Sequence, residues 1–255
     1  MIRISILGAG KVARHLYAAF NNTMLAKVVQ CYNRKGEKLH SNQKSSTITN
    51  DLNLLKEADV YILAISDDAI EEISKKLPFQ KQFVVHTSGS VPISSIYHTN
   101  RRGVFYPLQT FSKDRKINFS NIPFCLEAEN KTDLLLLNNL ANTLSQKTYT
   151  LSSDQRSVLH VAAVFINNFT NYLFSIGNDI CSENDIPFEI LHPLIQETAK
   201  KIVEIGPDDA QTGPAVRNDK TTINRHLTLL NTDSGKKELY KILTEAIRSK
   251  YGKKL

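Results

Sequence analysis

Short runs of β-branched and aromatic residues alternate with amphipathic segments over the first hundred residues of the chain. Strand-like runs occupy residues 1–7, 27–32, 60–65 and 83–86, with a weaker run at 46–48. Apolar residues at helical spacing follow at residues 11–20, 51–57 and 67–77, and Asp67 or Asp68 is placed to cap the last of these helices. Strands that alternate with helices predict parallel pairing and right-handed crossovers.

The pattern changes after Arg102. Further strands are expected at residues 103–106, 123–126 and 148–150, around one helix at 134–144. From Ser152 onward strand signals stop. Amphipathic helices are expected at residues 153–176, 187–205, 220–230 and 236–249. The sequence therefore predicts the α/β class, with a doubly wound parallel sheet over residues 1–151 and an all-helical domain over residues 152–255.

The charge balance changes this picture little. The chain of 255 residues carries 32 Lys and Arg against 25 Asp and Glu, and it has no Trp. No basic block is interleaved with aromatic residues, so we expect an anionic small ligand and a solvated basic C-terminal helix, not a nucleic-acid partner. The longest apolar run, Val60 to Ile65, is far shorter than the roughly 20 residues of a membrane span, so no membrane segment is expected.

Cysteine usage indicates a reducing compartment. Cys31, Cys125 and Cys181 are odd in number and far apart, which argues against a disulfide framework or a zinc site. No charged-then-apolar leader precedes the first strand-like run. We therefore expect a cytoplasmic protein without a structural metal.

A glycine-rich turn follows the first predicted strand. Residues 8–13 read Gly-Ala-Gly-Lys-Val-Ala and match the Gly-x-Gly-x-x-Gly/Ala pattern between a strand and a helix. Gly8 allows the tight turn, Gly10 leaves room for a pyrophosphate, and Ala13 lets the helix lie on the sheet. We predict a Rossmann-type dinucleotide site that includes Gly8, Ala9, Gly10, Lys11 and Val12. A glycine turn that binds nothing is the alternative.

The end of the second predicted strand indicates which dinucleotide binds. NAD sites usually carry Asp or Glu there, whereas this chain has Asn33, Arg34 and Lys35. Arg34 can hold a 2′-phosphate with two hydrogen bonds, and Lys35 adds charge. The predicted cofactor is therefore NADP, with Asn33 and Arg34 in its site, unless Arg34 and Lys35 are only an exposed loop pair.

Polar residues follow two further strands, at the edge of the sheet where ligands bind. Ile65 and Ser66 end one strand and are expected beside the cofactor. The next strand ends in residues 86–90, His-Thr-Ser-Gly-Ser, where Ser88 is the candidate for contact with nicotinamide or substrate. The alternative for His86 is a packed histidine with one hydrogen bond. The loop at residues 106–111 either lines the same cleft or packs for stability.

The long helix carries a polar stripe. At 100° per residue, His160, Asn167 and Asn171 lie within about 40° of one another, and Asn168 lies about 80° from His160. A substrate with a carbonyl and a carboxylate would satisfy these groups, and hydrogen bonds between helices are the alternative. In the irregular segment 212–219, Arg217 suits a substrate carboxylate, while Asp219 either orients Arg217 or caps the next helix.

These motifs together resemble a family of two-domain proteins with an N-terminal Rossmann-like oxidoreductase domain and a C-terminal helical domain of unassigned function. The family is distantly related to β-hydroxyacid dehydrogenases, 6-phosphogluconate dehydrogenase, ketopantoate reductase and pyrroline-5-carboxylate reductase. The resemblance rests on residues 8–13, 33–34, 86–90, 106–109, 160–169 and 212–219.

Two departures from the family pattern matter. Better-characterised relatives carry a catalytic Lys on the long helix, but no lysine occurs between Lys147 and Lys200. His160 is the nearest substitute, because histidine exchanges protons near neutral pH. The usual Arg-Gly-Asp reads Arg-Asn-Asp at residues 217–219, and Asn is the residue after Gly that best tolerates left-handed angles.

The resulting hypothesis is an NADP-dependent reductase of a small carbonyl or imine compound that carries a carboxylate. His160 would donate the proton, Asn168 would polarise the carbonyl, with Asn167 as the alternative, and Arg217 would hold the carboxylate. A ketopantoate-like 2-oxo acid is a substrate by family analogy only. The rival hypothesis is a non-catalytic NADP(H)-binding sensor or scaffold. The apolar surface of the helical domain predicts a homodimer.

Overall fold

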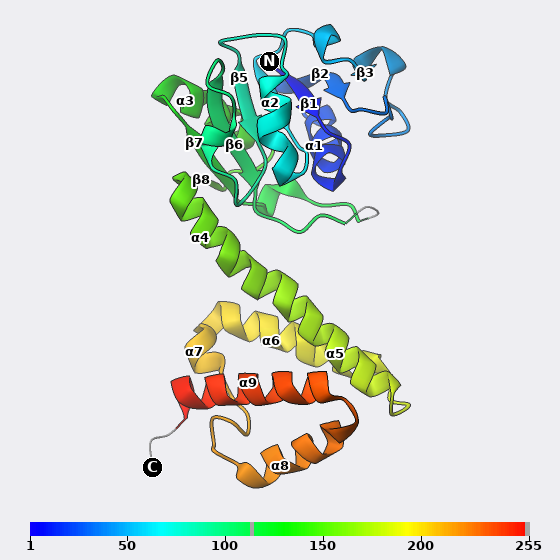
Figure 1. Ribbon diagram of the computed structural model, residues 1–255, viewed down its shortest axis with the longest axis vertical. Helices are drawn as coiled ribbons and strands as arrows, with labels where there is room; N and C mark the ends of the chain where they lie inside the picture. The colour runs from blue at the N-terminus through cyan, green and yellow to red at the C-terminus, as the bar shows by residue number, and fades with distance from the viewer. Residues whose placement is uncertain (113–114, 253–255) are drawn as a thin grey trace. The chain divides into compact units, whose positions relative to one another are not determined.

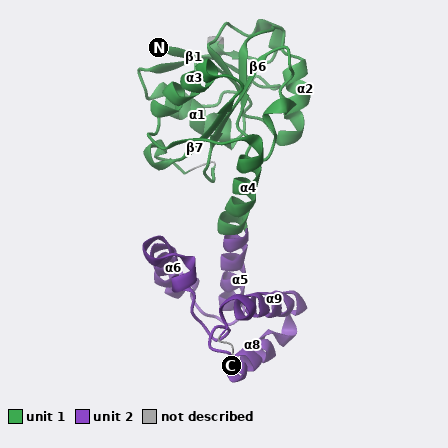
Figure 2. Cartoon of the chain, turned by 90° about the vertical axis from the view of Figure 1, so that its left-hand side faces the viewer, with its two compact units in different colours: residues 1–168 green, residues 169–255 purple. Residues whose placement is uncertain are grey.

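The computed structural model describes residues 1–112 and 115–252, which divide into two compact units, residues 1–168 and 169–255. Figure 1 shows the elements, and Figure 2 shows the two units. Strands give way to helices after Thr150, but the helix that begins at Ser153 belongs to the first unit as far as Asn168. The division thus lies inside this helix, beyond the predicted boundary at residue 151.

The first unit is built on one sheet, which has eight strands within the described residues. Their order is β3-β2-β1-β4-β5-β6-β7-β8. The strands are β1 Ile2–Leu7, β2 Ala26–Tyr32, β3 Ile48–Thr49, β4 Val60–Leu63, β5 Phe83–His86, β6 Arg101–Pro107, β7 Phe124–Ala128 and β8 Thr148–Thr150. The order reverses between β1 and β4, and this reversal leaves a crevice at the carboxyl ends of the strands. The predicted α/β class is confirmed.

The sheet is mainly parallel, as predicted, and β6 and β7 form an antiparallel pair within it. Strands β1 to β6 pair in parallel. Strand β7 runs antiparallel to β6, and β8 is parallel to β7. A parallel crossover normally needs a helix that packs on the sheet. Among the described residues between β6 and β7, the helical structure is one short turn, Phe119–Asn121, so β7 returns directly beside β6.

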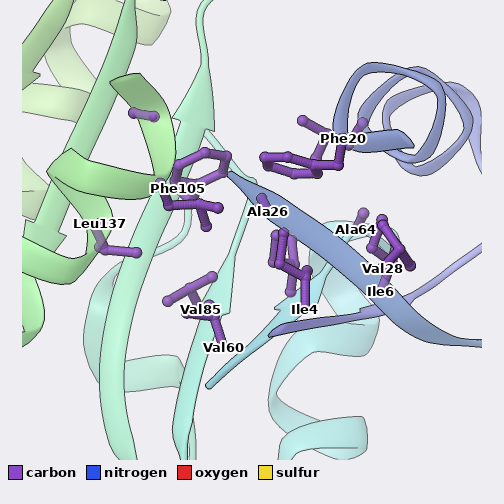
Figure 3. Packing of buried hydrophobic residues seen from close by; sticks show 14 of the residues in the cluster. Ile4, Ile6, Phe20, Ala26, Val28, Val60, Ala64, Val85, Phe105 and Leu137 are labelled. Carbon is purple, nitrogen blue, oxygen red and sulfur yellow. The ribbon is translucent and has the colours of Figure 1, made fainter. Parts of the chain in front are cut away.

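Helices cover both faces of the sheet. Helices α1 (Lys11–Asn21) and α3 (Lys131–Asn142) pack on one face, and α2 (Ile70–Lys75) packs on the other. Figure 3 shows the first of these two cores, where Phe20, Phe105 and Leu137 meet side chains of the central strands. In β4, alternate residues enter the two cores, which is why its whole sequence is apolar.

Some local expectations are wrong. The segment 51–57 forms no α-helix and contains one 3₁₀ turn, η2 (Leu52–Leu54). Neither Asp67 nor Asp68 caps α2, because both lie in the 3₁₀ turn η3 (Asp67–Ala69) that precedes it. The Asp67 carboxylate instead accepts a hydrogen bond from the Ser90 hydroxyl at 2.7 Å. The remaining 3₁₀ turns of the first unit are η1 (Ser45–Thr47), η4 (Ile93–Ser95) and η5 (Phe119–Asn121).

The long helix contains a wider turn. It starts at α4 (Ser153–Ala163) with a Ser152–Gln155 capping box, passes through a π-helical stretch η6 (Val164–Phe169) and continues as α5 (Thr170–Ser182). The second unit adds η7 (Phe188–Leu191), α6 (His192–Ile205), α7 (Pro207–Ala210), α8 (Lys220–Leu229), η8 (Leu230–Thr232) and α9 (Ser234–Tyr251). Among the described residues, no helix has the length and apolar character needed to span a membrane.

Candidate functional site

A cleft of about 770 Å³ opens at the carboxyl ends of β1, β2 and β4, where the strand order reverses. Of the predicted cofactor residues, all but Ala9 line it: Gly8, Gly10, Lys11, Val12, Asn33, Arg34, Ile65 and Ser66. The sequence missed its other wall, which the segment from the end of η3 to the C-cap of α2 supplies through Ala69, Glu72, Ile73 and Lys76, and also missed Tyr32, Leu52, Ala64 and Thr87. The α2 residues carry no motif, and only the packing of α2 beside β4 brings them to the cleft.

The two glycines of the turn serve different purposes. Gly8 has a φ of +132°, and a Cβ atom there would lie 2.1 Å from the Ala64 carbonyl oxygen. Gly8 is therefore required by the contact between β1 and β4. A Cβ atom at Gly10 would meet no atom within 4 Å. The fold would tolerate a side chain at Gly10, so the space beside it is available to a ligand.

The start of α1 offers backbone donors to that space. Its N-cap residue is Gly10, which provides no side-chain cap, and its first turn holds no acidic residue. First-turn amides have no partner within a helix, and the helix dipole adds positive potential, so this end suits a diphosphate. Arg14 holds the turn in shape, because its guanidinium donates to the carbonyl oxygens of Ala9 (3.1 Å) and Leu39 (3.0 Å).

Asn33 shapes the loop after β2. Its amide nitrogen donates to the Glu37 carbonyl at 2.8 Å, and its amide oxygen accepts from the Glu37 N–H at 2.9 Å. Arg34 is exposed at this turn, and its guanidinium makes no hydrogen bond within the described part of the chain. Lys35 lies 3.7 Å from the Glu37 carboxylate and is not a lining residue of the cleft.

Lys76, the C-cap residue of α2, is a further cation in the cleft beside Lys11 and Arg34. It forms an ion pair with Glu72, and both side chains line the cleft with Arg34. The hydrogen bond from Lys76 lowers the pKa of Glu72, and the positive charge of Arg34 lowers it further. The cleft therefore presents three cations, Lys11, Arg34 and Lys76, and one carboxylate, a balance that favours an anionic group.

Hydrogen bonds link His86, Ser88, Ser90 and Val91 at the end of β5. His86 is fully buried, and its Nδ1 accepts from the Ser88 N–H at 3.2 Å. Burial lowers the pKa of His86 to about 4, and the nearby Arg156 contributes to this shift. The Ser88 hydroxyl accepts from the amides of Ser90 and Val91, each at 3.1 Å. His86 is thus a packed histidine, and the Ser88 oxygen points to its own turn.

Three residues meet just beyond this network. The Tyr106 hydroxyl lies 3.3 Å from Nδ1 of His160, and their rings are edge-on. A Cβ atom at Gly89 would lie 2.5 Å from that nitrogen and 2.8 Å from the Tyr106 ring. Burial raises the pKa of Tyr106 to about 12. The segment at residues 106–111, which begins within β6, thus supplies the Tyr106 side chain that contacts His160, the predicted proton donor.

The π-helical stretch bears on the choice between the two asparagines. Asn167 and Asn168 both lie in it and are exposed, and the Asn167 amide donates to Asn168 Oδ1 at 3.4 Å. A π turn holds one residue more than an α turn, so Asn168 takes the position that a regular helix gives to Asn167. The angle between Asn168 and His160 around the helix axis is therefore smaller than the roughly 80° of a regular helix.

Arg217 belongs to the second unit, whereas the other candidate residues belong to the first. It is exposed, and Asn218 after it has a left-handed φ of +53°. Asp219 caps α8, since its carboxylate accepts from the Thr222 N–H at 3.0 Å and from the Thr222 hydroxyl at 2.7 Å. The capping alternative for Asp219 is therefore the one observed.

Comparisons with known proteins agree with this geometry. Residues 3–89 match the family described as NADP oxidoreductase, coenzyme F420-dependent, and residues 122–247 match a domain of unknown function (DUF2520). A Bacteroides fragilis protein of known structure, assigned as an NADP oxidoreductase, is 35% identical, with a TM-score of 0.85 over 97% of this chain and 98% of that one. Among curated proteins there is no match.

More distant solved structures share the fold. A Thermotoga maritima protein is 19% identical, with a TM-score of 0.74 over 96% of this chain and 97% of that one. The pyrroline carboxylate reductase of Plasmodium falciparum, solved with NADP bound, is 13% identical, with a TM-score of 0.62 over 98% of this chain and 97% of that one. The predicted Rossmann-like oxidoreductase resemblance is confirmed. The finer link to 6-phosphogluconate dehydrogenase and ketopantoate reductase stays a prediction.

Proposed function

The chain belongs to the same family as the Bacteroides fragilis NADP oxidoreductase, and on that basis we propose that it reduces small carbonyl or imine compounds that carry a carboxylate. The observation that carries this proposal is the cleft at the strand reversal, with open space at Gly10 and Arg34 at its rim. The chain is an oxidoreductase of the NADP-binding kind.

The cleft residues fit the parts of NADP. First-turn amides of α1 suit the diphosphate, and Arg34 with Lys76 suits the 2′-phosphate, which a carboxylate at the end of β2 would repel. Bound NADPH supplies the hydride, and the protein supplies orientation, a proton and anion binding.

The remaining roles fall to the predicted site residues. His160 is the source of the proton, and Asn168 polarises the substrate. Arg217 stays the candidate from the sequence for the substrate carboxylate. Ser88 shapes the strand end, a role that agrees with its hydroxyl accepting two backbone amides. The fold likeness to pyrroline carboxylate and imine reductases makes cyclic imines the first substrates to test, ahead of a ketopantoate-like 2-oxo acid.

In this proposal the chain forms a homodimer. Large apolar side chains of the second unit are exposed, including Ile190, Leu194 and Val203. Large apolar side chains exposed in this way favour an interaction site, and a homodimer would cover them without any further partner.

The first test is fluorescence titration of the full chain with NADPH and with NADH. We expect tighter binding of NADPH, followed by NADPH oxidation with members of a panel of cyclic imines and 2-oxo acids. His160→Ala should lower turnover sharply and leave NADPH affinity nearly unchanged. Binding without oxidation across the panel would favour the sensor or scaffold, and tighter binding of NADH would contradict the assigned cofactor.

A further inference from the structure

The contact between Tyr106 and His160 lies beside the dinucleotide cleft. Thr87, which follows β5, lines the cleft, and Gly89 two residues later touches both side chains. Tyr106 comes from the neighbouring strand β6, and His160 comes from α4. A glycine at position 89 is what allows the phenol and the imidazole to approach the same stretch of backbone.

A phenol and an imidazole at this distance can share a proton. The Tyr106 oxygen lies 3.3 Å from Nδ1 of His160, within hydrogen-bond range. Both side chains are only partly exposed, so the phenol can reach a small substrate while the imidazole exchanges protons with water. Tyr106 is protonated at neutral pH, and burial raises the pKa of the phenol further, to about 12.

Arg156 is a buried cation about one helical turn before His160 on α4. Arg156 of α4 is 1% exposed, and its Nη2 donates to the Val91 carbonyl at 2.6 Å and lies 3.4 Å from the Glu127 carboxylate. Its Nε and Nη1 atoms are buried without a hydrogen-bond partner in the described part of the chain. The Arg156 cation is thus paired with Glu127 but keeps two buried donor atoms without an acceptor.

Several charged or titratable groups act on the phenol. Cys125 of β7 and Asp67 beyond β4 raise the pKa of Tyr106 in addition to burial, and Arg156 lowers it. His160 is the group in direct contact. Of these groups, Arg156 is the buried cation that opposes the others, so it is the group that favours the phenolate.

We propose that Tyr106 delivers the proton to the substrate and that His160 replaces it. This inference rests on the proposed reductase function. As the substrate carbon receives hydride from the reduced nicotinamide dinucleotide, the O–H bond of Tyr106 breaks and a new bond forms to the carbonyl oxygen or imine nitrogen. The phenolate then takes the Nδ1 proton of the His160 imidazolium, which regains one from water. Arg156 is a positioning residue that stabilises the phenolate. One proton and one hydride are consumed per substrate.

The pair is tested first without cofactor or substrate. Nitrogen-15 NMR of labelled histidines in the full chain, with His160 assigned through His160→Gln, reports its tautomer and its titration. Tyr106→Phe should change both, whereas Tyr149→Phe, on the exposed edge strand β8, should change neither. A His160 signal that does not respond to Tyr106→Phe would overturn the proposal.

Turnover gives the second test, with pyruvate and a cyclic imine carboxylate as probes. Tyr106→Phe should lower kcat by roughly 100-fold or more and leave NADPH affinity within about twofold. Arg156→Gln should lower kcat by roughly tenfold and alter its pH profile, and Arg156→Lys should restore much of the loss, since it keeps the charge. Wild-type turnover by Tyr106→Phe would exclude Tyr106 as the donor. If wild type reduces neither probe although His160 responds to Tyr106→Phe, the reductase proposal fails and the proton-sharing pair stands.

Discussion

The two units of this protein differ in how they bury apolar side chains. The first unit has a core on each face of its sheet, in which residues such as Ile4, Phe20 and Phe105 are fully buried. In the described part of the second unit, the buried residues are Cys181 and Ala215. The first unit is therefore stabilised by its own contacts, whereas the described part of the second unit leaves nearly all of its large apolar side chains at least partly exposed.

The sharpest test of the self-contained first unit is its glycine turn. Gly8→Ala should cost roughly 4 kcal/mol or more in the free energy of unfolding, because the new Cβ atom would collide with the Ala64 carbonyl at a positive φ. Denaturant unfolding of the full chain measures this loss. Gly10→Ala is the matched control and should unfold like wild type while its NADPH affinity falls at least about tenfold. Equal stability of the two variants would show that the turn is not held by the strand contact.

Acid should also act on the first unit. As the pH falls from 7 toward 4, the unfolded chain takes up a proton at the ordinary histidine pKa, while buried His86 in the folded chain stays neutral until about pH 4. Stability present at pH 7 is thus lost over this range, by up to about 3 kcal/mol. The pH dependence of unfolding should flatten in His86→Gln and stay unchanged in His98→Gln, an exposed position. An equally steep loss in His86→Gln would assign the acid sensitivity to other groups.

The second unit should respond through association. Val203 is 86% exposed on α6, so Val203→Glu should leave each chain folded but weaken the proposed dimer by roughly tenfold or more, about 1.4 kcal/mol. Sedimentation over a range of concentrations measures the change. Gln196→Glu adds the same charge at an exposed polar position of α6 and should have little effect. A wild-type chain that sediments as a monomer at micromolar concentration would refute the dimer.

The smallest expected effect concerns cofactor choice in the first unit. Lys75 and Lys76 form equivalent ion pairs with Glu71 and Glu72, but Lys76 lines the cleft and Lys75 does not line it. Lys76→Gln should weaken NADPH binding by a few-fold to about tenfold and spare NADH, and Lys75→Gln should change neither. Arg34→Ala should act in the same direction as Lys76→Gln. Equal losses for NADPH and NADH would mean that Lys76 does not contact the 2′-phosphate.

Local sequence signals predicted most of the fold and one wall of the cleft. Gly8, Gly10 and Ala13 are close in sequence, so their effect on the turn and on α1 is set by backbone sterics alone. The same holds for Arg34, which lies two residues after the end of β2. Lys76 could not be predicted, because a solvent-exposed lysine on a helix looks the same whichever way the helix faces.

The sequence by itself determined the order of strands and helices, the dinucleotide turn and the lack of a lysine on the long helix, because these depend on nearest neighbours and spacing. Tertiary structure alone decided that Ser88 accepts bonds from its own turn, that Tyr106 meets His160 against Gly89, and that a π turn brings Asn168 toward His160. Tyr106, Gly89 and His160 come from different strands, turns and helices, so their contact depends on how whole elements pack. The hydrogen bonds of Ser88 and the π turn each form within one segment, but no motif in the sequence specifies them.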